Sequence, residues 1–198
     1  MKSYRCLGMF VAATLLAGPA ASPRSDLPKD APRDPARAAP AHDTRRAAPP
    51  RERQLRLYNT HTGERLDVVY RRGDAYVAGA VRTLERHLRD HRTGDVHAFD
   101  PRLFDVLSDL AEAAGMPDGE FQVISGYRSP KTNEMLRRRT TGVAKSSLHM
   151  RAQALDVRLP GIETSKLRDA ALALGRGGVG YYAHSDFIHV DVGPVRRW

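Results

Sequence analysis

The segment SLHMRAQALDVRL at residues 147–159 decides the fold that we expect for this chain. Its apolar half, from Ala152 to Leu159, predicts a strand, and the residues around His149 predict the loop that leads into it. Three further short runs of β-type residues are Phe121–Ser125, Gly178–Tyr182 and Phe187–Val192. Short strands that lie close together along the chain favour a small, mainly antiparallel sheet.

The remaining elements expected are a hairpin and four helices. Leu55–Asn59 and Leu66–Tyr70 are β-type runs on either side of a turn at Gly63. Helical spacing or composition predicts helices at Tyr76–Arg92, at Pro101–Ala114 (with Asp100 as N-cap and Gly115 at its end), at Lys131–Arg139 and at Thr164–Leu174. Because helices come first and most strands last, we expect an α+β domain over residues 55–198, with helices flanking the sheet.

Residues 1–54 have a different character. Lys2 and Arg5 precede an uncharged, mostly apolar run from Leu7 to Ala17, and small residues follow it, which indicates a signal peptide over residues 1–20. An uncleaved membrane anchor is the alternative, although the run is short for a stable membrane span. Residues 21–54 are rich in Pro, Ala and Arg, so we expect a disordered tether that carries an exported domain.

Composition limits the partners and the kinds of metal site. The net charge of +9 favours an anionic partner: nucleic acid, a membrane surface or a cell-wall polymer. No basic strip is interleaved with aromatic residues, so nucleic acid is not the partner that we expect. The single cysteine, Cys6, excludes an internal disulfide and a cysteine-based metal site. Any metal must therefore be held by His, Asp or Glu.

Three residues have the chemistry of a zinc site. His149 precedes a strand, Asp156 lies on that strand, and His189 lies within the late segment DFIHVD at residues 186–191. Imidazole nitrogen and carboxylate oxygen both bind Zn²⁺, and a catalytic zinc takes three protein ligands with one position open for water. Spacing alone leaves the alternative that these are surface, core or capping residues without a metal.

The wider pattern resembles the zinc D-Ala-D-Ala peptidases of the M15 class, and in particular the MepK-like branch of bacterial murein endopeptidases. The resemblance covers the folded body and rests on five ordered blocks: ISGYRSP (residues 124–130), GVAKSSLHM (142–150), ALDVRLPG (154–161), GGVGYY (177–182) and FIHVDVG (187–193). It implies the small zinc fold shared with the Hedgehog signalling domain. It also implies that His149, Asp156 and His189 hold Zn²⁺, and that the activity is hydrolysis of the peptide cross-links of peptidoglycan in the periplasm of a Gram-negative cell.

The resemblance also implies roles beside the metal. Arg128 would stabilise the oxyanion, and Asp186, three residues before the last zinc histidine, would be the general base; Asp191 competes for that role because it shares a strand face with His189. Ser147 would bond the substrate backbone or only shape its loop. Basic residues before the metal-binding histidine would contact the carboxylates of the substrate or form an ordinary solvated charge run: Arg137, Arg138, Arg139 and Lys145.

The chain departs from the family pattern at one position, and two other functions are compatible with the sequence. The family pattern carries Gly where this chain has Ala152, and we expect that only small size matters there. The other histidines, from His42 to His184, lack partners at ligand spacing and should be solvated. The partner expected is the peptide stem of peptidoglycan, with no oligomeric state predicted. The rivals are a D,D-carboxypeptidase and a non-catalytic, zinc-stabilised wall-binding module, and Asp186 together with Arg128 favours a catalyst.

Overall fold

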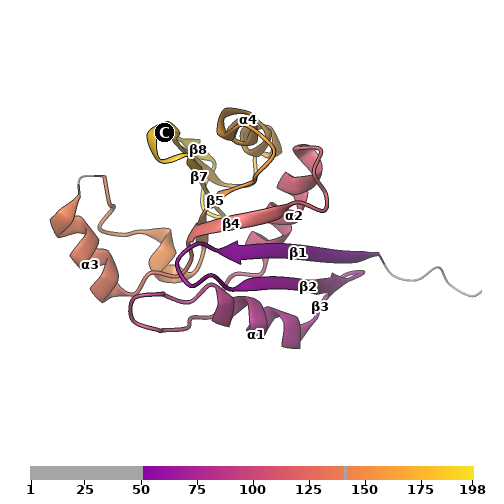
Figure 1. Ribbon diagram of the computed structural model, residues 1–198, viewed down its shortest axis with the longest axis horizontal. Helices are drawn as coiled ribbons and strands as arrows, with labels where there is room; N and C mark the ends of the chain where they lie inside the picture. The colour runs from indigo at the N-terminus through magenta and orange to yellow at the C-terminus, as the bar shows by residue number, and fades with distance from the viewer. Residues whose placement is uncertain (1–50, 141) are drawn as a thin grey trace, which may run out of the picture. The chain divides into compact units, whose positions relative to one another are not determined.

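The computed structural model describes residues 51–140 and 142–198, and in these ranges an eight-stranded sheet runs in the order β3-β2-β1-β4-β5-β7-β6-β8 (Figure 1). Among the described strands, only the β1–β4 and β6–β8 pairs are parallel. The mainly antiparallel sheet with helices is thus confirmed. The strands are β1 (Glu52–Asn59), β2 (Arg65–Arg72), β3 (Ala75–Tyr76), β4 (Glu120–Ser125), β5 (Ala154–Arg158), β6 (Gly178–Tyr182), β7 (Phe187–Asp191) and β8 (Arg196–Arg197).

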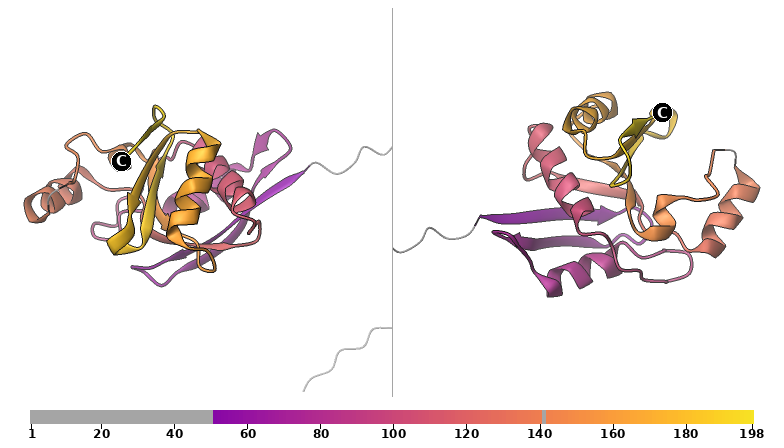
Figure 2. Two further views of the ribbon diagram at one scale, coloured as in Figure 1. Left: turned by 90° about the horizontal axis from the view of Figure 1, so that it is seen from above. Right: turned by 180° about the vertical axis from the view of Figure 1, so that it is seen from behind.

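Two helices pack side by side on one face of the sheet. α2 contacts α4 and β1, while α4 contacts β6 and β7 (Figure 2). The views of Figures 1 and 2 agree that α3 stands away from the sheet. The described helices are α1 (Ala78–His87), α2 (Arg102–Ala113), α3 (Pro130–Arg139) and α4 (Thr164–Leu174), with short 3₁₀ turns η1 (Leu148–Arg151) and η2 (Ala183–Ser185).

The core lies between that helical layer and the sheet, and it decides which way the strand residues point. Leu155 and Val157 of β5 and Ile188 and Val190 of β7 are buried in the core. Because successive side chains of a strand alternate between faces, the residues between them point to the opposite face. This face carries the candidate site.

The first strand begins earlier than predicted. Residues 52–54, expected in the tether, belong to β1, where Arg53 forms ion pairs with Asp105 and Asp109 of α2. These pairs tie the start of β1 to the helical layer. The expected signal peptide and most of the expected tether lie outside the described residues. No helix in the described ranges is long and apolar enough to cross a membrane.

Helix α1 is shorter than the predicted helix at both ends. It stops at His87, because the carbonyl of Leu88 accepts a hydrogen bond from the backbone N–H of Tyr127 instead of continuing the helix. The carboxylate of Asp90 then accepts the backbone N–H groups of Arg92 and Ser129. The apolar spacing continues past His87 because Leu88 is buried although it lies outside the helix. The end of the helix is set by hydrogen bonds to other segments of the chain.

A buried carboxylate ties α2 to the first strands. Asp105, 4% exposed, accepts hydrogen bonds from the hydroxyls of Tyr70 at 2.9 Å and Tyr76 at 2.5 Å. It also accepts from Arg71 at 2.9 Å and from Arg53 at 3.2 Å. Four donors around one buried carboxylate offset the cost of burying its charge.

Replacing Asp105 should destabilise the domain in a pH-dependent way. Burial opposes its ionisation, yet the hydrogen bonds from Tyr76, Tyr70 and Arg71 hold the pKa of Asp105 below its ordinary value of 3.8. Its contribution to stability is therefore present above that value and is lost as pH falls through the lower pKa of the folded state. We expect Asp105→Asn to lower the free energy of unfolding at neutral pH by about 2–3 kcal/mol.

Urea unfolding at neutral and at acidic pH tests this expectation. The difference between Asp105→Asn and the parent should shrink on acidification, because the parent carboxylate is then protonated. Equal stability of the two proteins at neutral pH would contradict the account.

Candidate metal centre

His149 is held in one orientation by a neighbouring loop, the one that follows β4. It lies on η1, is 2% exposed, and its Nδ1 lies 2.8 Å from the carbonyl oxygen of Gly126. A carbonyl only accepts, so Nδ1 carries the proton and Nε2 keeps its lone pair. The loop can approach this closely because a Cβ on Gly126 would lie 2.3 Å from the carbonyl oxygen of Leu88. The absence of a side chain at Gly126 thus allows its carbonyl to lie where it binds the imidazole of His149.

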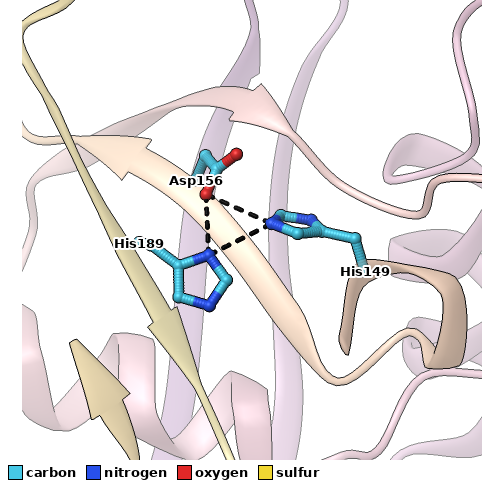
Figure 3. A group of neighbouring side chains, drawn as sticks. All are labelled: His149, Asp156 and His189. Carbon is cyan, nitrogen blue, oxygen red and sulfur yellow. Dashed lines mark hydrogen bonds and ion pairs between the residues drawn. The ribbon is translucent and has the colours of Figure 1, made fainter. Parts of the chain in front are cut away.

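Asp156 and His189 are cross-strand partners in the β5–β7 register. Asp156 Oδ1 lies 2.9 Å from His189 Nδ1 and 3.2 Å from His149 Nε2, and the two imidazole nitrogens are 3.1 Å apart. Figure 3 shows the three side chains pointing toward one another from β5, β7 and η1. In the described ranges no other group of three His, Cys, Asp or Glu residues gathers in this way.

The charges around these atoms favour a cation. Burial opposes ionisation of Asp156, but His149 and His189 hold its pKa below the usual range. Burial likewise disfavours a charged His189, yet Asp156 and Asp191 raise the pKa of this imidazole above its ordinary value. Asp156 thus stays ionised beside two histidines, and an ionised carboxylate with neutral imidazoles is the state that binds a metal ion.

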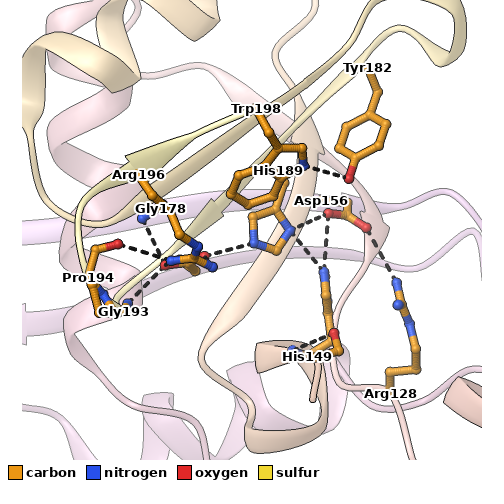
Figure 4. A network of polar contacts seen from close by, with 12 residues as sticks. Arg128, His149, Asp156, Gly178, Tyr182, His189, Gly193, Pro194, Arg196 and Trp198 are labelled. Carbon is orange, nitrogen blue, oxygen red and sulfur yellow. Dashed lines mark hydrogen bonds and ion pairs between the residues drawn. The ribbon is translucent and has the colours of Figure 1, made fainter. Parts of the chain in front are cut away.

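Asp191 orients His189 and is not placed as a general base. Its Oδ2 accepts from His189 Nε2 at 3.0 Å and from Arg196 Nη2 at 2.6 Å, and its Oδ1 accepts the backbone N–H groups of Gly178 and Gly193 (Figure 4). The side chain is fully buried. With both oxygens occupied and no access for water, the alternative base assignment does not fit. A carboxylate behind a ligating histidine instead fixes the ring and its tautomer.

Asp186, the first choice for the general base, points elsewhere. Its backbone is left-handed, with φ of 51°, and its carboxylate binds Arg158 at 3.1 Å and the hydroxyl of Thr164. Its side chain is 61% exposed and does not line the cleft beside the three ligand residues. The structure therefore does not bring Asp186 to the cluster, and its presence no longer separates a catalyst from a non-catalytic zinc module.

Arg128 is brought to the cluster, as the sequence predicts. Its Nη2 lies 3.6 Å from Asp156 Oδ2 and 3.2 Å from Ser125 Oγ. Burial lowers the pKa of Arg128, although a guanidinium keeps its charge in proteins. Within the described residues its buried Nε has no hydrogen-bond partner. The guanidinium therefore offers unused donors beside the cluster.

A cleft of about 710 Å³ opens over His149, Asp156 and His189. Ser147 lines it, and its hydroxyl accepts the backbone N–H of His149, so the loop-shaping role predicted for Ser147 is present. Lys145 is exposed and does not line the cleft. The lining residues include Arg128, Leu136, Val143, Ser146, Ser147, His149, Asp156, Tyr182, Ser185, Phe187, His189, Arg196 and Trp198.

The run of basic residues on α3 does not line the cleft either. Arg137 and Arg138 pair with Glu134 on the same helix, at 3.1 and 3.0 Å. Residue 139 is exposed at the end of the helix. The solvated charge run is thus the alternative that the structure favours, and the cationic groups of the cleft are Arg128 and Arg196.

Two smaller expectations are wrong. Ala152 has φ of 51° and is fully buried, so this position requires left-handed backbone as well as small size. A non-glycine residue there costs roughly 1–2 kcal/mol. His87, expected in solvent, is 6% exposed. His61, His97 and His184 are exposed as predicted, His91 is partly buried, and His42 lies outside the described residues.

Three aromatic residues of the cleft were not predicted from the sequence: Tyr182, Phe187 and Trp198. The sequence does indicate that another group packs here, because Gly178 and Gly180 lie two residues apart just before Tyr182. Glycines two apart on a strand leave one face bare, which indicates close approach of another group. Here that group is the side chain of Trp198, whose ring a Cβ on Gly180 would meet at 2.6 Å.

Comparison with known proteins identifies the family of this chain. The family model described as peptidoglycan L,D-endopeptidase MepK matches residues 47–198. A probable peptidoglycan L,D-endopeptidase MepK of Haemophilus influenzae is 42% identical over 149 residues, which are 75% of this chain and 80% of the relative. The peptidoglycan L,D-endopeptidase MepK of Escherichia coli K12 is 44% identical over 149 residues, 75% of this chain and 81% of the relative. The chain therefore belongs to the M15 peptidase family of the murein endopeptidase MepK.

Proposed function

We propose that this chain is a zinc metallopeptidase that hydrolyses peptide cross-links of peptidoglycan, including the L,D bond that joins two stems. The supporting observation is the convergence of His149 Nε2, Asp156 Oδ1 and His189 Nδ1 at the floor of a cleft that Arg128 also lines. The name of the relatives supports the bond type.

The donor set fits zinc. A tetrahedral ion with ligand bonds of about 2.0–2.2 Å separates its ligand atoms by about 3.3–3.6 Å. The three atoms here lie 2.9–3.2 Å apart, so each must move by only a few tenths of an ångström to hold the ion. The second nitrogens of both imidazoles are already bound, to Gly126 and to Asp191, as is usual for ligating histidines.

When bound, zinc polarises the scissile carbonyl and lowers the pKa of bound water to about 7. Arg128, which lines the cleft, would donate to the oxygen on which negative charge develops, where a preorganised donor acts most strongly. Asp191 keeps His189 in the tautomer that leaves Nδ1 free. Among the described residues of the cleft, Asp156 is the one carboxylate, and its Oδ1 belongs to the ligand set. We therefore assign no general base to Asp186 or Asp191.

The substrate and its location follow from charge and organisation. A cross-link between stems presents carboxylates near the scissile bond, and the guanidinium groups of Arg128 and Arg196 line the cleft, where they can donate hydrogen bonds to such groups. The net charge of +9 suits an anionic wall. A signal peptide over residues 1–20 and a tether after it would place the domain in the periplasm, among peptide stems. We also infer the fold of the Hedgehog and D-Ala-D-Ala peptidase zinc domains, since a mainly antiparallel sheet carries Asp156 and His189 on one face and the turn η1 adds His149 beside them.

Incubation with purified dimeric muropeptides tests the proposal. The zinc-loaded protein should convert dimers cross-linked between two diaminopimelate residues into monomers, which mass spectrometry identifies, and a chelator should stop the reaction. Dimers with the D-alanyl cross-link serve as the comparison for bond specificity. Release of terminal D-alanine from intact dimers would identify a D,D-carboxypeptidase instead. Binding of peptidoglycan without any cleavage would identify a non-catalytic module.

Asp191→Asn should weaken zinc binding without unfolding the site. The amide keeps the shape but loses the charge that orients His189 and pairs with Arg196. Loss of such a supporting group costs about 10–100-fold in metal affinity or activity. Competition with a chromogenic zinc chelator measures the affinity. An unchanged zinc affinity together with a lost hydrolysis rate would instead make Asp191 a direct participant in the reaction.

A further inference from the structure

We propose that the Tyr182 hydroxyl is a catalytic hydrogen-bond donor to the substrate oxyanion, acting with Arg128, and that Trp198 is the positioning residue that holds it there. This inference rests on the proposed peptidase function. It concerns two residues of the cleft that neither bind the metal nor support the ligands through the hydrogen bonds described above.

The strand register places Tyr182 on the face of the ligands. Gly180 pairs with His189 and Tyr182 pairs with Phe187 in the β6–β7 ladder. Residues two apart on a strand share a face, so Tyr182 and His189 project to the same side. The rings of Tyr182 and Phe187 stack with centroids 4.6 Å apart, which limits rotation of the phenol.

Backbone hydrogen bonds to β6 hold Trp198 beside this face of the sheet. Its backbone N–H donates to the carbonyl of Val179, and its carbonyl accepts the N–H of Tyr181. The indole lies against His189, with ring centroids 5.2 Å apart, and occupies the space that a Cβ on Gly180 would take. Arg196 also lies against the indole, 5.1 Å from its centroid. The ring thus contacts both His189 and a cation although it is 52% exposed.

The contact between the two aromatic residues decides which way the phenol proton points. Trp198 Nε1 donates to the Tyr182 hydroxyl at 3.0 Å. An indole N–H can only donate, so the phenol oxygen is the acceptor and its own proton is free to be given to another group. Within the described residues no acceptor for that proton lies at hydrogen-bond distance. An unused hydroxyl donor thus faces the cleft.

Tyr182 and Arg128 approach the cluster from different elements. Figure 4 shows the Tyr182 hydroxyl and the Arg128 guanidinium both near Asp156, one from β6 and the other from the loop after β4. Two donors near the ligand atoms can bind one oxyanion between them, as in other acyl-transfer sites. The donated hydrogen bond strengthens as charge develops, so it should act on kcat more than on KM.

Tyr182→Phe tests the donor directly. We expect kcat on the dimeric muropeptide to fall by about 10²-fold, with KM changed less than about threefold. Zinc content and thermal melting should stay as in the wild type. Tyr181→Phe is the matched control, because this neighbour on β6 lies beneath Arg168 outside the cleft. It should retain the wild-type kcat.

Trp198→Phe tests the positioning role. It keeps an aromatic ring against His189 but removes the N–H, and should lower kcat by about tenfold. In the Tyr182→Phe background the same change should have no further effect, because the hydroxyl that it positions is gone. Trp198 is the single tryptophan of the chain, so its emission should also shift in Tyr182→Phe, where the indole loses its acceptor, and not in Tyr181→Phe.

The outcomes separate this inference from the proposed function. Cleavage by the wild type, with Tyr182→Phe equally active or with the two substitutions acting additively, overturns the inference and leaves the peptidase. Intact dimers in the presence of the zinc-loaded wild type overturn the peptidase and the inference together. A non-additive pair with an emission shift in Tyr182→Phe supports both.

Discussion

Asp156→Ala should leave a folded protein that neither binds zinc nor cleaves cross-links. The substitution removes the one carboxylate of the ligand set, and the two imidazoles that remain give an incomplete site. We expect the zinc content to fall to background and kcat/KM to fall by more than about 10⁴-fold, since enzymes supply at least about 10⁶-fold over the uncatalysed reaction. Elemental analysis and the muropeptide assay measure the two quantities.

Asp186→Ala is the matched control for this experiment. It removes a carboxylate that is close in sequence to His189 but binds Arg158 and Thr164 outside the cleft. We expect this variant to keep its zinc and most of its rate. If instead Asp186→Ala keeps zinc and loses about 10²–10⁴-fold in rate, the residue is a general base after all and its orientation must change when substrate binds.

Arg128→Ala should separate catalysis from metal binding. Its guanidinium lies 3.6 Å from Asp156 and keeps a buried N–H without a partner, so it supports no ligand by a short hydrogen bond. Loss of one oxyanion donor costs about 10²–10³-fold in kcat. The variant should therefore bind zinc and cleave slowly, as elemental analysis and the muropeptide assay can show.

Arg128→Lys tests whether the charge of Arg128 or its set of N–H donors matters for catalysis. Lysine restores the charge but not the fork of N–H groups, so we expect only a small recovery of the rate. Full activity of Arg128→Ala would remove Arg128 from the mechanism and leave Tyr182 as the donor to examine.

The convergence of His149, Asp156 and His189 could be predicted from the sequence because strand chemistry and family pattern agree on it. The segments at 154–159 and 187–192 are β-type, and two such strands can pair with Asp156 opposite His189. The mainly antiparallel sheet follows from the same short runs. The position of His149 depends on a loop, and the family pattern supplied it where spacing alone could not.

The placement of the two candidate bases could not be predicted, because spacing gives no direction to a side chain in a turn. Asp186 lies three residues before His189, yet its left-handed backbone sends the carboxylate to Arg158. Asp191 shares the face of His189, as alternation predicts, but Arg196 and two backbone N–H groups bury it. That environment is built by β8 and by the glycines of β6, whose effect appears only when the chain is folded.

We propose that His149, Asp156 and His189 hold zinc. Diffraction from crystals of the full-length protein, collected on both sides of the zinc absorption edge, tests this proposal most directly. We predict one anomalous peak that appears only above the edge and lies between His149 Nε2, Asp156 Oδ1 and His189 Nδ1. Crystals grown with zinc that show no peak there, or a peak only at other residues, would contradict the claim.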